Sequence, residues 1–291
     1  MPKDKTLYWG IKDEGLGPTY MTRGAQLESL VDRKEELRRV RAAIDKRQSL
    51  LIWGPADAGK TALIGRAIAE LPESERRNCI YSTGAASRRQ LVSHFVGRLY
   101  KLSDTFVRKK VHADGATGAS LNQWLNKQTS LRLRGILFTA SAQGEYRFFV
   151  DHFPPATHNL AQLMKEIMYR CKTPIYLAAR GYAQNEIGYA WSLYWNDVLR
   201  VHVGPLNERA ARELLETCIR SFGLGSLNLK DFRDDILRLS GRLPGSIVKM
   251  CELASQAQYR YDDLIKVKLV HVDYLMQTNR ANHESTQTLM S

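Results

Sequence analysis

The residues with the clearest chemistry are eight in a row, Gly54-Pro55-Ala56-Asp57-Ala58-Gly59-Lys60-Thr61. They match the spacing G-x-x-x-x-G-K-[ST] in full, between the apolar run SLLIW and the helical pattern TALIGRAIAEL. Gly54 and Gly59 allow a bend that points backbone N–H groups at phosphate oxygens. Lys60 offers a point charge to the β and γ phosphates, and the Thr61 hydroxyl is a ligand for Mg²⁺. The pattern predicts a loop that binds ATP, with Ala62 beside it; the alternative is a glycine turn next to a lysine.

A magnesium site of this kind needs a carboxylate at the end of a second strand. Asp151 is the candidate, because three apolar residues precede it in RFFVDHF, residues 147–153. Together with Thr61 it is predicted to bind Mg²⁺. The alternative role for Asp151 is capping of a strand end, since two prolines follow the strand.

Two further side chains could act on bound phosphates. His152 stands where a water-activating Glu or Asp is usual, and imidazole can act as a base near neutral pH but has no permanent negative charge. We therefore expect slow hydrolysis or a nucleotide-held switch, unless His152 merely packs on the strand end. Arg180 follows the run TPIYLAA and could contact the γ-phosphate if that strand lies beside the loop strand. Otherwise Arg180 is a surface arginine.

Apolar runs and helical periodicity give the elements that must position these residues. Strands are predicted at 49–53, 79–83, 135–140, 146–153, 173–179 and 198–203. Helices are predicted at 25–47, 61–71, 87–102, 121–131 and 158–171. Alternating strands and helices predict a three-layer α/β fold with a mainly parallel sheet.

The domain organisation follows from changes in residue composition and hydrophobic periodicity along the chain. Residues 1–24 are glycine-rich and are predicted to form an N-terminal arm. The ATPase core spans 25–204 and contains a basic insertion at 103–135. A small all-helical domain is predicted at 205–280, followed by a flexible tail at 281–291.

The charge of the chain suggests a partner. Among 291 residues, 43 are Lys or Arg and 30 are Asp or Glu, a net charge of +13. This excess favours a polyanionic partner, nucleic acid above all, over a merely well-solvated surface. Four basic residues near the insertion are candidate contacts: Lys109, Lys110, Arg132 and Arg134. The aromatic stretch YAWSLYW, residues 189–195, is either a helix on the core or a stacking or partner surface.

Other classes of protein are disfavoured. The four cysteines are far apart and have no metal-site spacing, which predicts reduced buried thiols. No apolar run approaches the ~20 residues of a membrane span, and the N-terminus has no apolar signal segment. The expected location is the cytoplasm.

In their order, these pieces resemble the AAA+ and STAND branches of the P-loop ATPases. VDRKEEL, residues 31–37, resembles the element that covers adenine in those families, with Asp32 in place of the usual glycine. That resemblance implies that Val31 and Arg33 lie near the adenine. RFFVDHF resembles Walker B without its catalytic glutamate, and IYLAARGY resembles sensor 1. VHVGPLNERAARELL and SGRLPGSIVKMCELA resemble the lid, which implies that Pro244 contacts the nucleotide side.

The resemblance implies a Mg-ATP-dependent switch that engages nucleic acid in replication, transposition or defence, with protein partners or a homo-oligomer. The usual arginine-finger stretch, 194–199, holds no arginine, so ring-type catalysis is not indicated. A second hypothesis is a signalling STAND switch that binds protein and no nucleic acid. A third, a small-molecule kinase, is disfavoured by the helical block after Pro205.

Overall fold

The computed structural model of the protein describes residues 32–85 and 87–290, which form two compact units. The α/β unit comprises Glu35–Pro55 and Lys60–His202. The helical unit comprises Val203–Ser291 together with Ala56–Gly59 and the segment that ends at Lys34. The predicted N-terminal arm, 1–24, lies outside the described residues.

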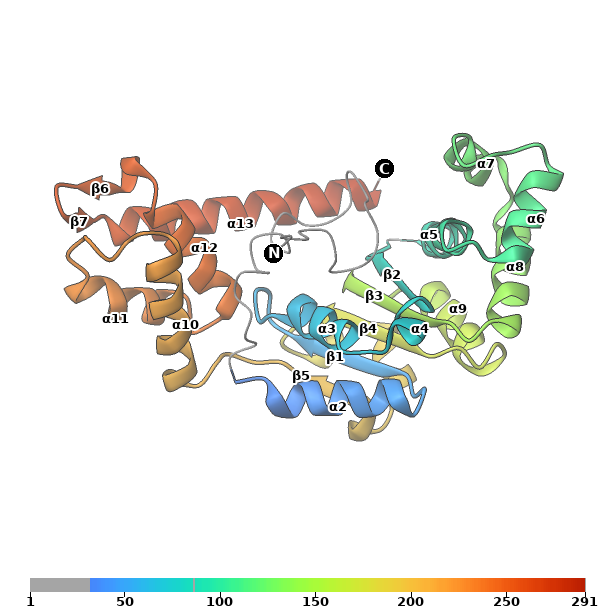
Figure 1. Ribbon diagram of the computed structural model, residues 1–291, viewed down its shortest axis with the longest axis horizontal. Coiled ribbons are helices and arrows are strands. Elements are labelled where there is room, and N and C mark those ends of the chain that lie inside the picture. The colour runs from blue at the N-terminus through green and yellow to red at the C-terminus, as the bar shows by residue number, and fades with distance from the viewer. Residues whose placement is uncertain (1–31, 86, 291) are drawn as a thin grey trace. The chain divides into compact units, whose positions relative to one another are not determined.

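The α/β unit is built on one parallel sheet of five strands. The strands are β1 (Leu50–Gly54), β2 (Cys79–Thr83), β3 (Arg147–Phe153), β4 (Ile175–Arg180) and β5 (Arg200–His202). Their order across the sheet is β2-β3-β4-β1-β5, and every neighbouring pair is parallel (Figure 1). Parallel neighbours need long crossover connections, which here are helical. The predicted three-layer α/β core with a mainly parallel sheet is therefore confirmed.

Helices precede β1 and fill the connections between the strands. They are α2 (Lys34–Asp45), α3 (Lys60–Ala69), α4 (Glu73–Arg76), α5 (Arg88–Lys101), α6 (Thr105–Ala113), α7 (Leu121–Lys127), α8 (Ser130–Gln143) and α9 (His158–Tyr169). Short 3₁₀ helices η1 (Gln184–Glu186), η2 (Tyr189–Tyr194) and η3 (Asp197–Leu199) connect β4 to β5.

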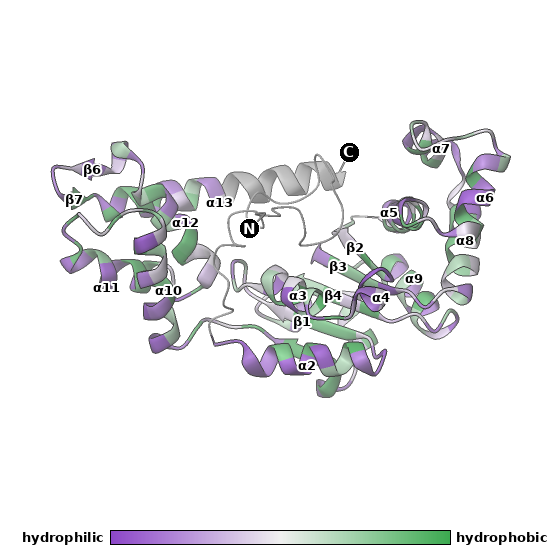
Figure 2. Ribbon diagram, viewed as in Figure 1, coloured by the Kyte–Doolittle hydropathy of each residue, from purple (hydrophilic) through white to green (hydrophobic). Residues whose placement is uncertain are grey.

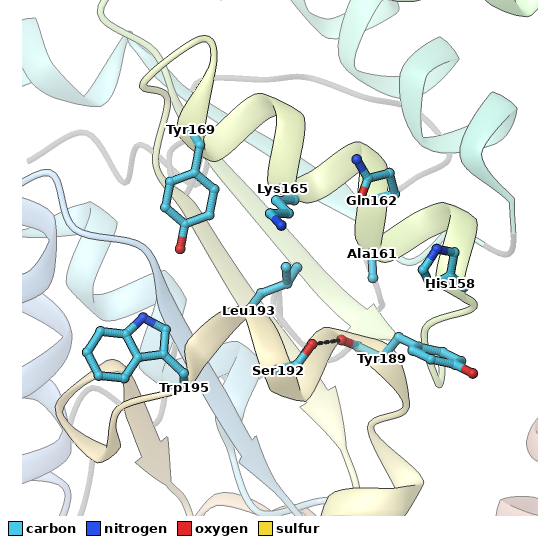
Figure 3. Close-up of a pocket in the computed structure, with 9 residues that line it drawn as sticks. All are labelled: His158, Ala161, Gln162, Lys165, Tyr169, Tyr189, Ser192, Leu193 and Trp195. Carbon is cyan, nitrogen blue, oxygen red and sulfur yellow. Dashed lines mark hydrogen bonds between the residues drawn. The ribbon is translucent and has the colours of Figure 1, made fainter.

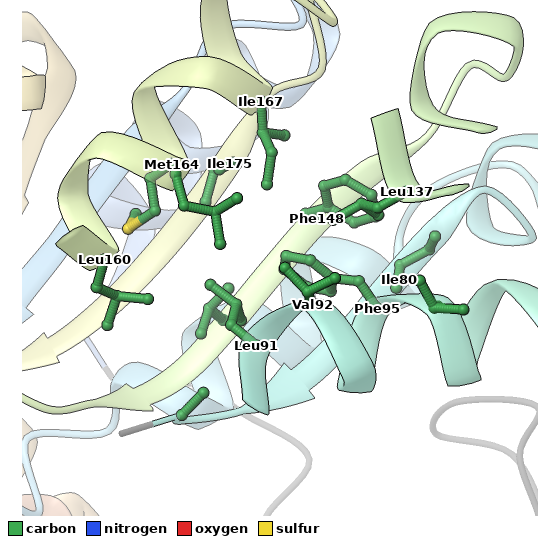
Figure 4. Close-up of a cluster of buried hydrophobic side chains, with 14 of the residues drawn as sticks. Ile80, Leu91, Val92, Phe95, Leu137, Phe148, Leu160, Met164, Ile167 and Ile175 are labelled. Atoms are coloured by element: carbon green, nitrogen blue, oxygen red, sulfur yellow. The ribbon is translucent and has the colours of Figure 1, made fainter. Parts of the chain in front are cut away.

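Alternate residues of the central strands face two different helical layers, as the period of two in a strand requires. Phe148 and Ile175 pack with Phe95 of α5 and with residues of α9 in one cluster (Figure 4). On the opposite face Phe149 stacks on Tyr176, with ring centroids 4.6 Å apart. The Tyr176 hydroxyl donates a hydrogen bond of 3.3 Å to the Ala43 carbonyl of α2. Both faces of the sheet are thus buried, which explains the continuous apolar runs in its strands.

One predicted strand is wrong. Residues 135–140, GILFTA, lie inside helix α8. Leu133, Ile136, Leu137 and Ala140 are buried at helical spacing, while Thr129 caps the helix by accepting a hydrogen bond from the Arg132 amide. A short apolar run cannot by itself distinguish a buried strand from a buried helix, and here the cap and the length of the helix decide it. The predicted insertion, 103–135, contains α6, α7 and the start of α8.

The helical unit has a core of its own. It contains α10 (Glu208–Ser221), α11 (Lys230–Leu239), α12 (Pro244–Ala254), the 3₁₀ turn η4 (Ala257–Tyr259) and α13 (Val267–Met290). Figure 2 shows polar and apolar residues interleaved along α10, whose buried face includes Ala211, Leu215 and Cys218. A two-stranded hairpin of β6 (Arg260–Tyr261) and β7 (Leu264–Ile265) lies within the region predicted to be all-helical. Helix α13 also continues through residues 281–290, where the sequence predicted a flexible tail.

Across the part of the chain that the structure describes, no helix combines the length and apolar character needed to cross a membrane.

The end of strand β3 carries a local irregularity that matters for the site. Its register with β4 shifts between Val150 and Phe153, and His152 has a φ of 54°, in the left-handed region. A shift of this kind re-aims side chains at a strand end. Gly84, just after β2, lies against this bulge: a Cβ atom built on Gly84 would be 2.2 Å from the carbonyl oxygen of His152.

We expect Gly84→Ala to lower the free energy of unfolding by about 1–3 kcal/mol, because the new methyl group overlaps a backbone oxygen. Urea unfolding of the purified protein measures this change. Gly135→Ala is the matched control, since a Cβ there meets nothing within 4 Å and alanine favours the α8 helix. Equal stability of Gly84→Ala and wild type would contradict the close approach of Gly84 to His152.

Candidate nucleotide-binding site

The phosphate-loop sequence lies between a strand and a helix, as the motif requires. Strand β1 ends at Gly54 and helix α3 begins at Lys60. Gly59 has a φ of 90°, a backbone conformation that side chains with a Cβ rarely adopt. The first N–H groups of α3 have no partner within the helix, and a terminus of this kind can bind an anion.

The Lys60 side chain folds over its own loop. Its ammonium donates hydrogen bonds to the carbonyl oxygens of Gly54, at 2.9 Å, and Pro55, at 2.6 Å. The charge is therefore held at the loop by backbone acceptors, within reach of any phosphate that the loop binds.

Arg180 ends the strand next to the phosphate-loop strand. In the register of β1 and β4, Gly54 lies opposite Arg180, and the Gly181 amide donates to the Gly54 carbonyl at 3.1 Å. A contact between Arg180 and the γ-phosphate was predicted only if its strand lies beside the loop strand. That condition is met, because β4 is the neighbour of β1. Its side chain is exposed. The carboxyl ends of parallel strands share one sheet edge, so Asp151 at the end of β3 lies at the same edge.

Asp151 is the buried acid of this edge. Its side chain is enclosed, with 1% of the residue exposed. One carboxylate oxygen accepts hydrogen bonds from the Thr61 hydroxyl, at 2.6 Å, and the Tyr81 hydroxyl, at 2.7 Å. The other oxygen accepts the backbone N–H of His152, at 2.8 Å. The structure thus brings together Thr61 and Asp151, the two predicted magnesium ligands.

The surroundings of Asp151 set its ionisation. Burial raises the pKa of its carboxyl, but the hydrogen bond and charge of His152, with the hydroxyls of Thr61 and Tyr81, lower the pKa below its ordinary value. Burial, the nearby charge of Asp151 and the hydrogen bond to it all raise the pKa of Tyr81. Tyr81 therefore stays protonated and donates, while Asp151 stays anionic at neutral pH.

His152 lies next to this carboxylate and is open to solvent. Its side chain is 62% exposed, and its Nδ1 atom is 3.3 Å from an oxygen of Asp151. The left-handed backbone at His152 turns its side chain out of the buried pattern of β3. An exposed imidazole here can exchange a proton with water, whereas an enclosed one could not.

The donor set at this edge suits Mg²⁺ and a triphosphate. Magnesium in proteins is commonly held by one or two protein oxygens together with phosphate oxygens and water. Thr61 and Asp151 supply a hydroxyl and an ionised carboxylate within 2.6 Å of each other. Among residues 32–85 and 87–290, no group of three or more His, Cys, Asp or Glu side chains could hold an ion alone.

The middle of the loop is anchored within the helical unit. The Asp57 carboxylate accepts hydrogen bonds from Lys249 of α12, at 2.8 Å, and from the Tyr274 hydroxyl of α13, at 3.0 Å. The Asp57 carbonyl accepts the Gly245 amide at 2.8 Å. A Cβ built on Gly245 would be 2.8 Å from that of Asp57, so glycine permits this approach.

Two residues implied by the family resemblance also lie in this unit. Arg33 is buried, with 6% of its surface exposed, and donates to the carbonyls of Ala58, at 3.3 Å, and Gly204. Pro244 begins α12, and its Cγ would be 3.4 Å from a Cβ built on Gly59. Both therefore contact the loop region. Val31 lies outside the described residues.

The basic residues proposed for nucleic acid do not form one free patch. Arg132 is bound by both oxygens of Asp114, at 2.9 and 2.7 Å, and Arg134 lies 3.8 Å from Glu166. Lys109 and Lys110 are exposed on α6. Carboxylate partners reduce the positive potential that the two arginines can offer to a polyanion.

Comparison with known proteins gives a likeness in structure. No family model matches the chain, and no curated protein matches its sequence. A Walker-type ATPase of Pyrococcus abyssi aligns with 90% of this chain and 77% of its own, at TM-score 0.57 and 14% identity. The ORC1 protein of Aeropyrum pernix, solved in complex with DNA, aligns with 84% of this chain and 66% of its own, at TM-score 0.55 and 16% identity. At these identities the likeness concerns the fold: the chain shares the fold of this Walker-type ATPase and of the ORC1 protein.

The lowered pKa of Asp151 predicts a pH dependence of stability. An aspartate titrates near 3.9 in an unfolded chain, so the ionised Asp151 stabilises the fold above about pH 4. This contribution is lost as the pH falls through the lower folded pKa. We expect the free energy of unfolding to fall more steeply from about pH 5 to pH 2 in wild type than in Asp151→Asn.

Urea unfolding at a series of pH values measures both slopes. Asp197→Asn is the control, because it removes an aspartate whose side chain is 95% exposed and should keep the wild-type profile. Parallel profiles of wild type and Asp151→Asn would show that Asp151 does not carry this dependence.

Proposed function

We propose that the protein binds Mg-ATP and acts as a nucleotide-dependent switch with slow hydrolysis, working on or with nucleic acid. The observation that carries the proposal is the hydrogen bond between Thr61 and the buried Asp151 at the edge where the phosphate loop ends. In the P-loop fold these two oxygens are suited to one magnesium ion.

The chemistry is electrostatic. The amides of the loop and the N-terminus of α3 bind phosphate oxygens, and the Lys60 ammonium moves from its backbone acceptors to the β and γ phosphates. Arg180 adds positive charge at the end of the neighbouring strand. Thr61 and Asp151 would hold a magnesium ion, which would supply charge neutralisation for the bound phosphates.

Slow turnover follows from what surrounds the phosphates. His152 can accept a proton from water but has no fixed negative charge to orient it. Arg200 follows the stretch 194–199, where an arginine finger would be expected, and its guanidinium is engaged within the chain, 3.1 Å from Asp197 and 3.9 Å from the centre of the Trp191 ring. These contacts support a bound nucleotide that persists, as a switch requires.

The helical unit supports the switching part of the proposal. Asp57 is held by Lys249 and Tyr274, and its carbonyl is held by Gly245. A change in loop conformation on nucleotide binding therefore acts directly on α12 and α13. Pro244 is proposed to contact the nucleotide from the side of the helical unit. Arg33 and Val31 are proposed to lie near the adenine.

Two observations support nucleic acid as the partner. The net charge is +13, and a structure with the same fold, the ORC1 protein, was solved with DNA. A regulator of replication, transposition or defence would fit such a partner. The cytoplasmic location expected from the sequence stays a prediction.

A specific feature favours the second candidate, a protein-binding switch or homo-oligomer. Helix α13 exposes four apolar side chains at helical spacing: Leu269, Val272, Leu275 and Met276, each 43–50% exposed. An exposed apolar row of this kind is typical of a protein contact. Salt-dependent binding of the wild-type chain to nucleic acid separates the two candidates, because only the first requires it.

Lys60→Ala should weaken ATP binding by about 10- to 100-fold, because it removes a charge-assisted contact to the phosphates. Equilibrium titration with a fluorescent ATP analogue measures the dissociation constant. Lys172→Ala, which removes an exposed lysine after α9, is the control and should bind like wild type. Unchanged affinity of a folded Lys60→Ala protein would remove the phosphate-loop assignment.

His152→Glu should raise the steady-state rate of ATP hydrolysis by about tenfold or more, since a carboxylate next to Asp151 can orient and deprotonate water. Phosphate release measures the rate. His152→Gln, similar in size but unable to act as a base, should not exceed wild type. If His152→Glu and wild type hydrolyse ATP equally fast, position 152 is not the water-activating position.

A further inference from the structure

A groove of about 420 Å³ opens on the α/β unit between helix α9 and the 3₁₀ helix η2 (Figure 3). Its walls are formed by His158, Ala161, Gln162, Lys165, Tyr169, Tyr189, Ser192, Leu193 and Trp195. None of these residues belongs to the candidate nucleotide site. The groove is therefore a second feature of the α/β unit that needs its own explanation.

Three aromatic side chains in the groove are left open to solvent. Tyr169, Tyr189 and Trp195 are 56%, 60% and 70% exposed. Their neighbours in the same segment are used differently. Tyr194 is fully buried and donates to the Ile175 carbonyl at 3.2 Å, and Trp191 packs edge-on against Trp53. Part of the aromatic surface of the segment YAWSLYW is thus buried in the core, and the rest is exposed and available for contact with another molecule.

The groove lining holds one cationic side chain, that of Lys165. Lys165 and His158 are its titratable lining side chains besides the tyrosines, and no carboxylate lines it. The carboxylate next to Lys165, Glu166, is 3.8 Å from Arg134 of α8, and Asp197 pairs with Arg200. These two acidic side chains thus have basic partners, and the Lys165 ammonium can attract an anion.

The arrangement of these groups indicates which class of ligand the groove can bind. Tyr169 and Trp195 lie at one end of the groove and His158 and Tyr189 at the other, with Lys165 between them (Figure 3). The Tyr189 ring makes an edge contact with the His158 ring, and the two ring centroids are 5.4 Å apart. The backbone carbonyl of Tyr189 accepts a hydrogen bond of 2.9 Å from the Ser192 hydroxyl. The groove therefore presents flat aromatic faces on both sides of a cation. A nucleic-acid strand presents bases on both sides of each phosphate, so the two arrangements are complementary.

We propose that this groove binds single-stranded nucleic acid, whose bases stack on Tyr169, Tyr189 and Trp195 while Lys165 binds a phosphate. The faces of the bases are accessible in a single strand, whereas a duplex buries them within its own stack. The inference rests on the nucleic-acid partner of the proposed function and specifies where and in which form that partner binds. Gln162 and Ser192 add polar groups that can contact base edges.

Fluorescence anisotropy with a labelled oligothymidylate of about 12 nucleotides, at about 50 mM salt, tests the groove. Wild type should bind it more tightly than a duplex of the same length. Trp195→Leu and Tyr189→Leu should each weaken binding by about 5- to 100-fold, because leucine keeps an apolar side chain but removes the stacking face. Trp195→Phe should retain most of the affinity.

One control and one further groove variant accompany these substitutions. Tyr261→Leu changes a tyrosine that is 64% exposed on β6 and outside the groove, and it should bind like wild type. Lys165→Gln should reduce the slope of log Kd against log salt by about one. The substituted side chains are exposed, so thermal unfolding should confirm that every variant remains folded.

The outcomes distinguish a failure of the groove assignment from a failure of the proposed nucleic-acid role. If wild type binds nucleic acid but the groove variants bind within twofold of it, the groove assignment is overturned and the nucleic-acid role stands. If the variants change the sedimentation coefficient but not oligonucleotide affinity, the groove is a contact between copies of the chain and the inference fails. A wild-type chain that binds neither single strand nor duplex at low salt would remove nucleic acid from the proposed function itself.

Discussion

A buried negative charge organises the edge of the sheet. An ionised carboxylate inside a protein is costly unless polar groups satisfy it, and Asp151 has three such groups from three different elements. Thr61 comes from the helix after the phosphate loop, Tyr81 from the outermost strand, and the amide of His152 from the bulge in β3. Satisfying one charge therefore fixes the relative positions of α3, β2 and the end of β3. The same arrangement leaves a hydroxyl and a carboxylate together at the end of the phosphate loop.

The loop itself takes part in both compact units. Its first two residues and Lys60 belong to the α/β unit, whereas Ala56–Gly59 group with the helical unit. The anchor in the helical unit is the carboxylate of Asp57, a position for which the loop pattern specifies no residue type. An acid in an anion-binding loop would by itself repel phosphate. The ammonium of Lys249 offsets that charge and at the same time ties the loop to α12, which is how this sequence reconciles an acidic loop residue with phosphate binding.

Local sequence was enough for the elements that carry the chemistry and insufficient for the contacts between distant residues. The strand, loop and helix around Gly54–Thr61 follow from a spacing and two periodicities. The role of Arg180 was conditional on its strand lying beside the loop strand, and the pairing of β1 with β4 meets that condition. Residues 135–140 were misassigned because their apolar run fits a strand and a helix equally well, and the packing of α8 decides between them. Tyr81, Lys249 and Tyr274 were missed because each meets its aspartate across 70 to 217 residues of chain. Nothing in a single sequence marks such pairs.

The left-handed backbone at position 152 has an evolutionary consequence. Histidine, asparagine and aspartate tolerate that conformation better than most residues, and glutamate has no such advantage. The bulge therefore filters which amino acids can stand beside Asp151 before any selection for activity operates. Aspartate would adopt the left-handed conformation at this position at a lower conformational cost than glutamate. Glutamate can occupy this position only at a higher conformational cost, so the local backbone influences which side chains stand beside Asp151.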